Sequence, residues 1–235
     1  MTAAGRDQPP EALPGWLLPL ARAADDVQPE QLSRFLPPDD GGGRRSAVLI
    51  LFGDGPEGPD LLVIERARDM SSHAGQPAFP GGMAEPGDDG PVGTALREAE
   101  EETGLDPSGV HVFATLPALY LPPSGFVVTP VVGWWRESSP VYAADPAEVA
   151  AVDRVPLAQM LDPANRLSVR HPSGYVGPAF KLRGLLVWGF TAGLASRLFA
   201  VAGWERPWPE DRVEDLPDDA VALAVRDLSR GEESP

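Results

Sequence analysis

The feature that most constrains this chain is a glutamate-rich segment, REAEEETGL at residues 97–105, within a stretch of helical periodicity. The residues spaced as a buried helical face (i, i+3, i+4, i+7) are Val92, Ala95, Leu96 and Ala99. Pro91 suits the first turn of a helix, and Gly104 suits the left-handed residue that ends one. The segment therefore predicts an amphipathic helix with one face in the core.

Three of the four glutamates share another face of this helix. At about 100° per residue, Glu98, Glu101 and Glu102 fall within an arc of roughly 100°, while Glu100 points away. Like charges at this spacing cost about 0.2–0.5 kcal/mol per pair, unless a cation lies between them. Hard divalent ions such as Mg²⁺ bind carboxylate oxygens and substrate phosphates together. Alone, such a run is more typical of a charged helix that faces solvent. The Phe79-Pro80-Gly81-Gly82 segment at a fixed distance before it favours the alternative, a metal site.

The remaining pattern predicts a mixed sheet with helices on both faces, an α/β fold. The expected strands are 46–52 and 60–67, which form a hairpin, followed by 110–121 and 126–135. The expected helices after the glutamate-rich one are 146–152, 156–161 and 185–202. The stretch between the last two helices is polar and rich in turns.

Composition limits the classes of partner. A net charge of −16 argues against nucleic acid and anionic membranes, which require a basic face. No apolar run reaches about 18 residues, so no membrane span is expected. Cysteine is absent, which excludes disulfides and thiolate metal sites. These observations favour a cytoplasmic protein whose 43% hydrophobic residues can form a sizeable core.

A turn-rich segment precedes the helix and contains Phe79-Pro80-Gly81-Gly82. Together with residues 97–105, it resembles the signature of Nudix hydrolases, and the match over 97–105 is unbroken. The usual spacing places Met83 at the signature glycine and Asp89 at its acidic position. A one-residue insertion places Gly82 and Asp88 there instead.

The segment before the signature resembles the coenzyme A pyrophosphatase branch of that family. The matching residues are Leu62 to Ala67, Ser72 to Gln76 and Phe79 to Gly82. The chain departs from the branch pattern at Val63, Ile64 and Ser71. Residues 128–133 and 187–193 also resemble this branch, and the similarity extends over about residues 45–203.

The resemblance implies a Nudix fold, an α/β/α sandwich with a mixed central β-sheet, over residues 44–204. Residues 1–43 are then a partly helical N-terminal extension, with short helices at 15–25 and 29–36. Residues 205–235 form an acidic C-terminal tail, with one short helix expected at 219–228.

The resemblance also implies Mg²⁺ or Mn²⁺ as cofactor and a role for each signature residue. Glu98 and Glu102 are the expected principal ligands, and the carbonyl of Gly82 is a further one. Glu101 is a third ligand, or it holds the water bound to the metal. Arg97 orients Glu101 through an ion pair one helical turn apart.

Further residues outside the helix are candidates for catalysis and substrate binding. Glu148 is either a general base or a first-turn glutamate that stabilises a helix N-terminus. Arg66 is the leading candidate for contact with the 3′-phosphate of coenzyme A. His73 is expected to contact phosphate or to make a structural hydrogen bond, and Gly81 and Gly82 let the backbone approach the substrate.

The function implied is metal-dependent cleavage of coenzyme A or acyl-CoA to 3′,5′-ADP and (acyl-)4′-phosphopantetheine. One alternative is another nucleoside diphosphate derivative, such as ADP-ribose, NADH or a dinucleoside polyphosphate, for which Tyr120 is a weak marker. Another is an inactive Nudix domain that only binds ligand. Trp134, Trp135 and Trp188 are expected in the core or at an interface, so a homodimer remains open.

Overall fold

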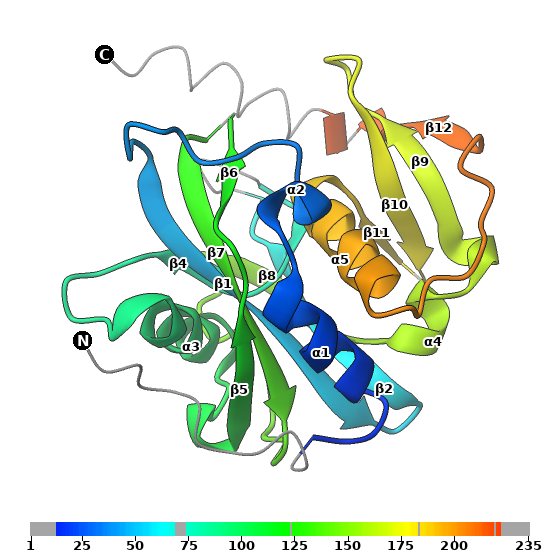
Figure 1. The fold of residues 1–235 in the computed structure, drawn as a ribbon. Coiled ribbons are helices and arrows are strands. Elements are labelled where there is room, and N and C mark those ends of the chain that lie inside the picture. The colour runs from blue at the N-terminus through cyan, green and yellow to red at the C-terminus, as the bar shows by residue number, and fades with distance from the viewer. Residues whose placement is uncertain (1–12, 69–73, 123, 183, 219, 222–235) are drawn as a thin grey trace.

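The computed structural model describes residues 13–68, 74–122, 124–182, 184–218 and 220–221. These residues form two β-sheets, and helices pack on both faces of the larger one (Figure 1). The larger sheet contains β1 (Arg44–Gly55), β2 (Gly58–Arg66), β3 (Pro77–Ala78), β4 (Gly81–Met83), β5 (Val110–Thr115), β6 (Leu119–Leu121), β7 (Phe126–Trp135) and β8 (Val149–Pro156). The smaller sheet contains β9 (Arg166–Arg170), β10 (Val176–Leu182), β11 (Leu185–Val187) and β12 (Val213–Asp215).

The α-helices of the described chain are α1 (Leu18–Asp26), α2 (Pro29–Leu32), α3 (Gly90–Thr103), α4 (Leu157–Met160) and α5 (Gly189–Val201). Among them, no helix is long and apolar enough to cross a membrane. The glutamate-rich helix is α3, and it ends as predicted. Gly104 has φ 67° and its N–H donates to the carbonyl of Glu100 at 2.8 Å.

The larger sheet is mixed, as the sequence predicts. Strands β1 and β7 run parallel, and the other pairs are antiparallel. The predicted hairpin is β1–β2, which closes at the Gly55–Gly58 pair. Strand β1 pairs with β4 near its start, where Ala47 lies opposite Gly82, and with β2 only from Phe52 onward. This change of partner places the Gly81–Gly82 segment beside the central strand.

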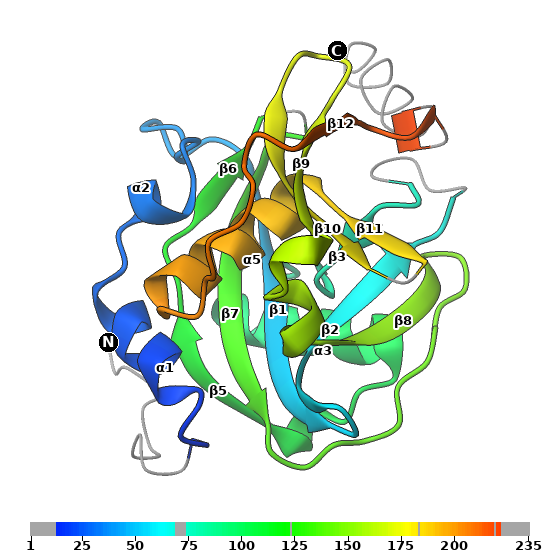
Figure 2. The same ribbon diagram turned by 90° about the vertical axis from the view of Figure 1, so that its right-hand side faces the viewer.

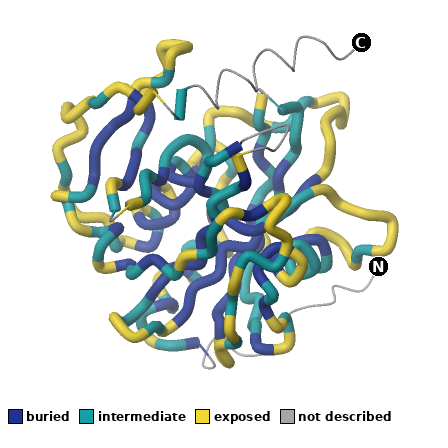
Figure 3. The backbone as a smooth tube through the Cα atoms, turned by 180° about the vertical axis from the view of Figure 1, so that it is seen from behind, coloured by how far each residue is buried: buried dark blue, intermediate teal, exposed yellow. Residues whose placement is uncertain are grey.

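The side chains of β1 alternate between two hydrophobic layers, as a strand buried on both faces requires. Leu49 and Leu51 pack with Ala95 and Ala99 of α3. Ile50 and Phe52 face the opposite layer, which contains α1 and α5. Figure 2 shows α5 on one side of β1 and α3 on the other. Figure 3 shows that the buried segments gather in the interior and that exposed segments lie around them. The architecture is therefore an α/β/α sandwich.

Both predicted N-terminal helices are present, although α1 ends at Asp26, just beyond its predicted range. Helix α1 packs against the larger sheet, and α2 packs against α5. Leu17 and Leu20 are fully buried in the layer that contains α5. The ring of Trp16 meets that of Trp134 edge to face at 5.9 Å. The N-terminal segment thus completes the core on this side.

The predicted helix at 146–152 is wrong, because residues 149–156 form β8. Its alanines favour a helix, but the free edge of β2 offers backbone partners along Asp60 to Arg66. The Asp145 carboxylate accepts the N–H of Ala147 at 2.9 Å and forms a turn that leads into the strand. The helix predicted at 156–161 is present as α4.

Three other sequence predictions need correction. Residues 110–121 form two strands, β5 and β6, rather than one. The long helix predicted at 185–202 begins only at Gly189, because residues 185–187 form β11. The polar stretch before it forms strands β9 and β10 of the smaller sheet, and the sequence pattern did not indicate a second sheet. The helix predicted at 219–228 falls almost entirely outside the described residues.

Candidate active site

Three of the four glutamates of α3, Glu98, Glu101 and Glu102, line a large cleft and differ sharply in exposure. The side chain of Glu102 is 2% exposed, that of Glu98 is 14% exposed and that of Glu101 is 58% exposed. All three line the cleft. Glu100 is exposed on another side, as the helical spacing predicts.

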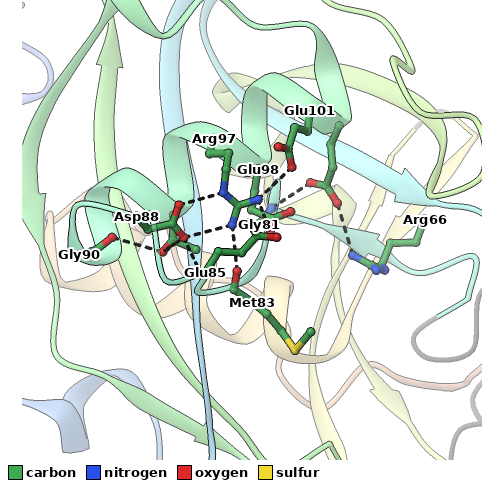
Figure 4. A network of polar contacts seen from close by, with 11 residues as sticks. Arg66, Gly81, Met83, Glu85, Asp88, Gly90, Arg97, Glu98 and Glu101 are labelled. Carbon is green, nitrogen blue, oxygen red and sulfur yellow. Dashed lines mark hydrogen bonds and ion pairs between the residues drawn. The ribbon is translucent and has the colours of Figure 1, made fainter.

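Arg97 is the centre of the polar network that surrounds these carboxylates (Figure 4). Its Nη1 donates to Glu101 Oε2 at 2.9 Å, so the predicted ion pair is present. The same nitrogen lies 3.1 Å from Glu98 Oε1, and Nη2 donates to the carbonyl of Met83 at 3.0 Å. One guanidinium thus joins two glutamates of α3 to the β4 segment.

Asp88, and not Asp89, is the acidic residue that completes this network. Asp88 accepts hydrogen bonds from Arg97, from the Thr94 hydroxyl at 2.8 Å and from the Glu85 N–H at 2.8 Å. These hydrogen bonds, chiefly those from Arg97, hold the pKa of Asp88 well below the ordinary range. Asp89 precedes the helix and makes no side-chain capping bond. The geometry therefore agrees with the one-residue insertion.

Glu102 is buried where two segments before α3 converge. Its Oε2 accepts the Gly81 N–H at 2.9 Å, and its Oε1 lies 3.5 Å from Arg66 Nη1. Burial raises the pKa of Glu102 to about 8, although Gly81 and Arg66 both favour the charged form. The negative charges of Glu98 and Glu148 raise this pKa further.

Arg66 reaches Glu102 from the end of β2, beside an irregularity in the pairing with β8. Glu65 lies opposite Ala151, but Arg66 lies opposite Val149, so β8 carries one extra residue. Such bulges bend a strand and redirect its side chains. The sequence suggested Arg66 for the 3′-phosphate, whereas the structure places its guanidinium beside the α3 carboxylates.

Gly82 lies directly against the carboxylate of Glu98. A Cβ atom added at Gly82 would collide with that carboxylate. Glycine therefore leaves room for the Glu98 carboxylate, and a side chain here would displace the end of Glu98 from its position.

Glu148 lies beside the glutamates of α3 and lines the same cleft. Its charge contributes to the raised pKa of both Glu98 and Glu102. Its backbone carbonyl accepts the Ala67 N–H at 2.7 Å, which ties it to the end of β2. The alternative role at a helix N-terminus is wrong, because a strand follows Glu148.

The donor chemistry of this cluster suits a hard divalent cation. The charges of Glu101 and Glu148 both oppose that of Glu98, and a cation would relieve that repulsion. Within the described ranges, no group of three acidic or histidine side chains already converges on one point. Arg97 and Arg66 engage the carboxylate heads instead.

The cleft has a volume of about 2090 Å³ and extends well beyond α3. Its far walls come from the segment after α2, the turn between β9 and β10, and α5. The sequence did not predict a role for Arg34, Phe35 and Tyr175, which line it there. Phe35 follows Arg34 in the sequence, a pair too common to be informative, and Tyr175 has no such neighbour. His73, a predicted phosphate contact, lies outside the described residues.

Comparison with known proteins agrees with the geometry. The family model described as the NUDIX domain matches residues 43–173. Two similar proteins come from Yersinia pestis (strain Pestoides F) and Yersinia pseudotuberculosis (serotype O:1b, strain IP 31758), and both are named "Uncharacterized Nudix hydrolase NudL". Each is 40% identical to this chain over 158 residues. The matched region is 66% of this chain and 78% of the relative. The solved structure of RenU, a Nudix hydrolase from M. smegmatis, is 21% identical with a TM-score of 0.46, over 72% of this chain and 95% of that one.

Proposed function

Because the chain belongs to the Nudix family of hydrolases, which act on nucleoside diphosphate derivatives, we propose that its substrate is coenzyme A or an acyl-CoA. The products are 3′,5′-ADP and 4′-phosphopantetheine or its acylated form. One observation carries this proposal. Arg66 and Gly81, from the segment that resembles coenzyme A pyrophosphatases, both contact Glu102.

The size of the cleft also supports a large substrate. Sites for small molecules commonly have volumes of about 300–1,000 Å³, and this cleft has about 2090 Å³. Coenzyme A extends in two directions from its diphosphate, and the cleft extends to walls on both sides of the sheet. A mononucleotide would leave most of this volume to water.

Glu98 and Glu102 are the proposed ligands of Mg²⁺ or Mn²⁺, with the carbonyl of Gly82 as a further ligand. Bound divalent ions neutralise the diphosphate charge and make water a better nucleophile. Arg97 holds Glu101, which is a third ligand or orients the attacking water. Arg66, beside Glu102, is assigned to the diphosphate rather than to the more distant 3′-phosphate.

Glu148 is the proposed general base. The oxygen of water forms a bond to one phosphorus of the diphosphate while the bridging P–O bond breaks. Glu148 accepts the proton that water loses, and the bridging oxygen leaves with the other phosphoryl group. The two products thus share the atoms of the substrate and one water molecule.

A substrate panel tests this proposal. The purified protein is incubated with coenzyme A, acetyl-CoA, ADP-ribose, NADH and diadenosine tetraphosphate, with Mg²⁺ or Mn²⁺, and kcat/KM is measured for each. The expected result is the highest kcat/KM for coenzyme A or its thioester. Faster turnover of ADP-ribose, NADH or the dinucleotide would refute the coenzyme A assignment.

A further inference from the structure

At the wall of the cleft formed by α2 and the smaller sheet, three side chains form a cluster of one cation and two aromatic rings. The guanidinium of Arg34 lies 4.6 Å from the ring centroid of Phe35 and 4.9 Å from that of Tyr175. Phe35 is 40% exposed and Tyr175 is 41% exposed. Large aromatic rings exposed together inside a cleft are typical of a binding surface rather than of a core.

Both rings are held by the backbone of separate parts of the chain. The carbonyl of Phe35 accepts the Tyr120 N–H at 3.2 Å, which fastens the segment after α2 to β6. In the β9–β10 turn, the His171 N–H donates to the Tyr175 carbonyl at 2.8 Å. The Tyr175 ring lies over Gly177, where an added Cβ would come within 2.6 Å of the hydroxyl oxygen. The cluster is therefore built by the fold.

Arg44 lines the same cleft as this cluster and the glycines of the site. Its guanidinium lies 4.2 Å from the ring centroid of Phe126, and its Nη2 donates to the Ser124 carbonyl at 2.7 Å. Arg44 begins β1, and two residues later, about 7 Å along the strand, Ser46 pairs with Met83 beside Gly82. The aromatic cluster, Arg44 and the glycines of the site thus line one cleft.

We propose that Phe35 and Tyr175 bind the purine base of the substrate by stacking, and that Arg34 and Arg44 bind phosphate on the same nucleotide half. The assignment rests on the proposed function, since it concerns one half of coenzyme A. Aromatic rings and arginine recognise the flat face of a base. The pantetheine half is a saturated amide chain without such a face. The 3′-phosphate lies on the nucleotide half, where the arginines gather.

Calorimetric titration with the two halves of coenzyme A tests the aromatic contacts. Phe35→Ala and Tyr175→Ala are each expected to weaken binding of 3′,5′-ADP at least about fivefold, the effect of losing one base stack. Binding of 4′-phosphopantetheine is expected to change less than about twofold. The matched control is Leu36→Ala, because Leu36 is 39% exposed and adjacent to Phe35 but does not line the cleft.

Leucine variants separate stacking from general damage to the fold. Phe35→Leu and Tyr175→Leu keep apolar bulk but lose the π face, so they should also weaken binding of 3′,5′-ADP at an unchanged melting temperature.

Arg44→Gln should weaken binding of 3′,5′-ADP more than binding of 5′-AMP, because only the former carries the 3′-phosphate.

Unchanged binding of 3′,5′-ADP in the four aromatic variants would overturn the proposal, as would a loss confined to 4′-phosphopantetheine. Both titrations measure binding without turnover. If the protein cleaves another adenine nucleotide, the same variants should still weaken 5′-AMP, and only the coenzyme A assignment would fail.

Discussion

Both carboxylate oxygens of Asp88 accept hydrogen bonds from the guanidinium of Arg97, at 2.9 Å from Nε and 3.1 Å from Nη2. Two parallel bonds of this kind fix orientation as well as distance. The remaining nitrogen of Arg97 holds Glu101. Through Arg97, Asp88 in the loop before α3 therefore fixes the position of the Glu101 carboxylate near the end of the helix.

Asp88→Asn should lower activity because an amide cannot accept both bonds from the guanidinium. Arg97 would then turn, and Glu101 would lose its fixed position. Misplacing a catalytic group by about 1 Å can cost on the order of 100-fold in rate, so we expect kcat to fall roughly 10- to 100-fold. Asp89→Asn is the matched control, and equal losses in both variants would contradict this account.

Gly82→Ala should nearly abolish activity while the protein remains folded. The added methyl group would collide with the Glu98 carboxylate and displace it from the site. Gly87→Ala is the control, because an added Cβ at Gly87 meets no atom within 4 Å. Activity in Gly82→Ala within about twofold of wild type would show that Glu98 need not occupy its observed position.

Glu102→Gln should stabilise the metal-free protein at high pH although it removes activity. Burial raises the pKa of Glu102 from 4.5 to about 8. The folded state therefore holds this proton to higher pH than the unfolded state, and stability is lost as pH rises from about 4.5 to about 8. Glutamine carries no charge to bury. In EDTA at about pH 9, we expect a melting temperature about 2–4 °C higher, the shift that 1 kcal/mol causes in a domain of this size.

At about pH 5 the melting temperatures of Glu102→Gln and wild type should converge, since Glu102 is then protonated in the fold. Glu100→Gln is the control, because Glu100 is exposed on the same helix and should melt like wild type at both pH values. A lower melting temperature for Glu102→Gln at about pH 9 would refute the electrostatic explanation.

Arg154→Ala should destabilise the fold without a direct effect on the site. Arg154 Nε lies 2.8 Å from Asp60 Oδ2, Nη2 donates to Oδ1 at 3.1 Å, and the Asp60 side chain is 4% exposed. Removing one partner of a buried pair typically costs about 3–5 kcal/mol. Because Arg154 is 25% exposed, we expect about 3 kcal/mol by urea unfolding. The exposed pair of Arg170 and Asp215 gives the control, and Arg170→Ala should change stability little.

The sequence was sufficient for the parts of the fold that depend on local periodicity. The face of α3, its end at Gly104 and the β1–β2 hairpin follow from residue spacing alone. The grouping of Glu98, Glu101 and Glu102 follows from the same helical geometry. Their very different exposure does not, because it depends on how β4 and β2 cover the end of the helix.

Features set by distant partners could not be predicted. Strand β8 has a helix-like composition and becomes a strand only because the edge of β2 is free. The smaller sheet joins β9 to β12, segments more than 40 residues apart, and no local pattern indicates that pairing. The approach of Tyr175 to Arg34, which also lies beside Phe35, depends on both sheets being in place.

The most direct test of the account is product analysis of coenzyme A after incubation with the protein and Mg²⁺. We predict equal amounts of 3′,5′-ADP and 4′-phosphopantetheine, no product in EDTA, and a rate reduced about 100-fold or more in Glu148→Gln but unchanged in Glu100→Gln. Intact diphosphate, or release of the 3′-phosphate alone, would contradict the assignment of this site to coenzyme A hydrolysis.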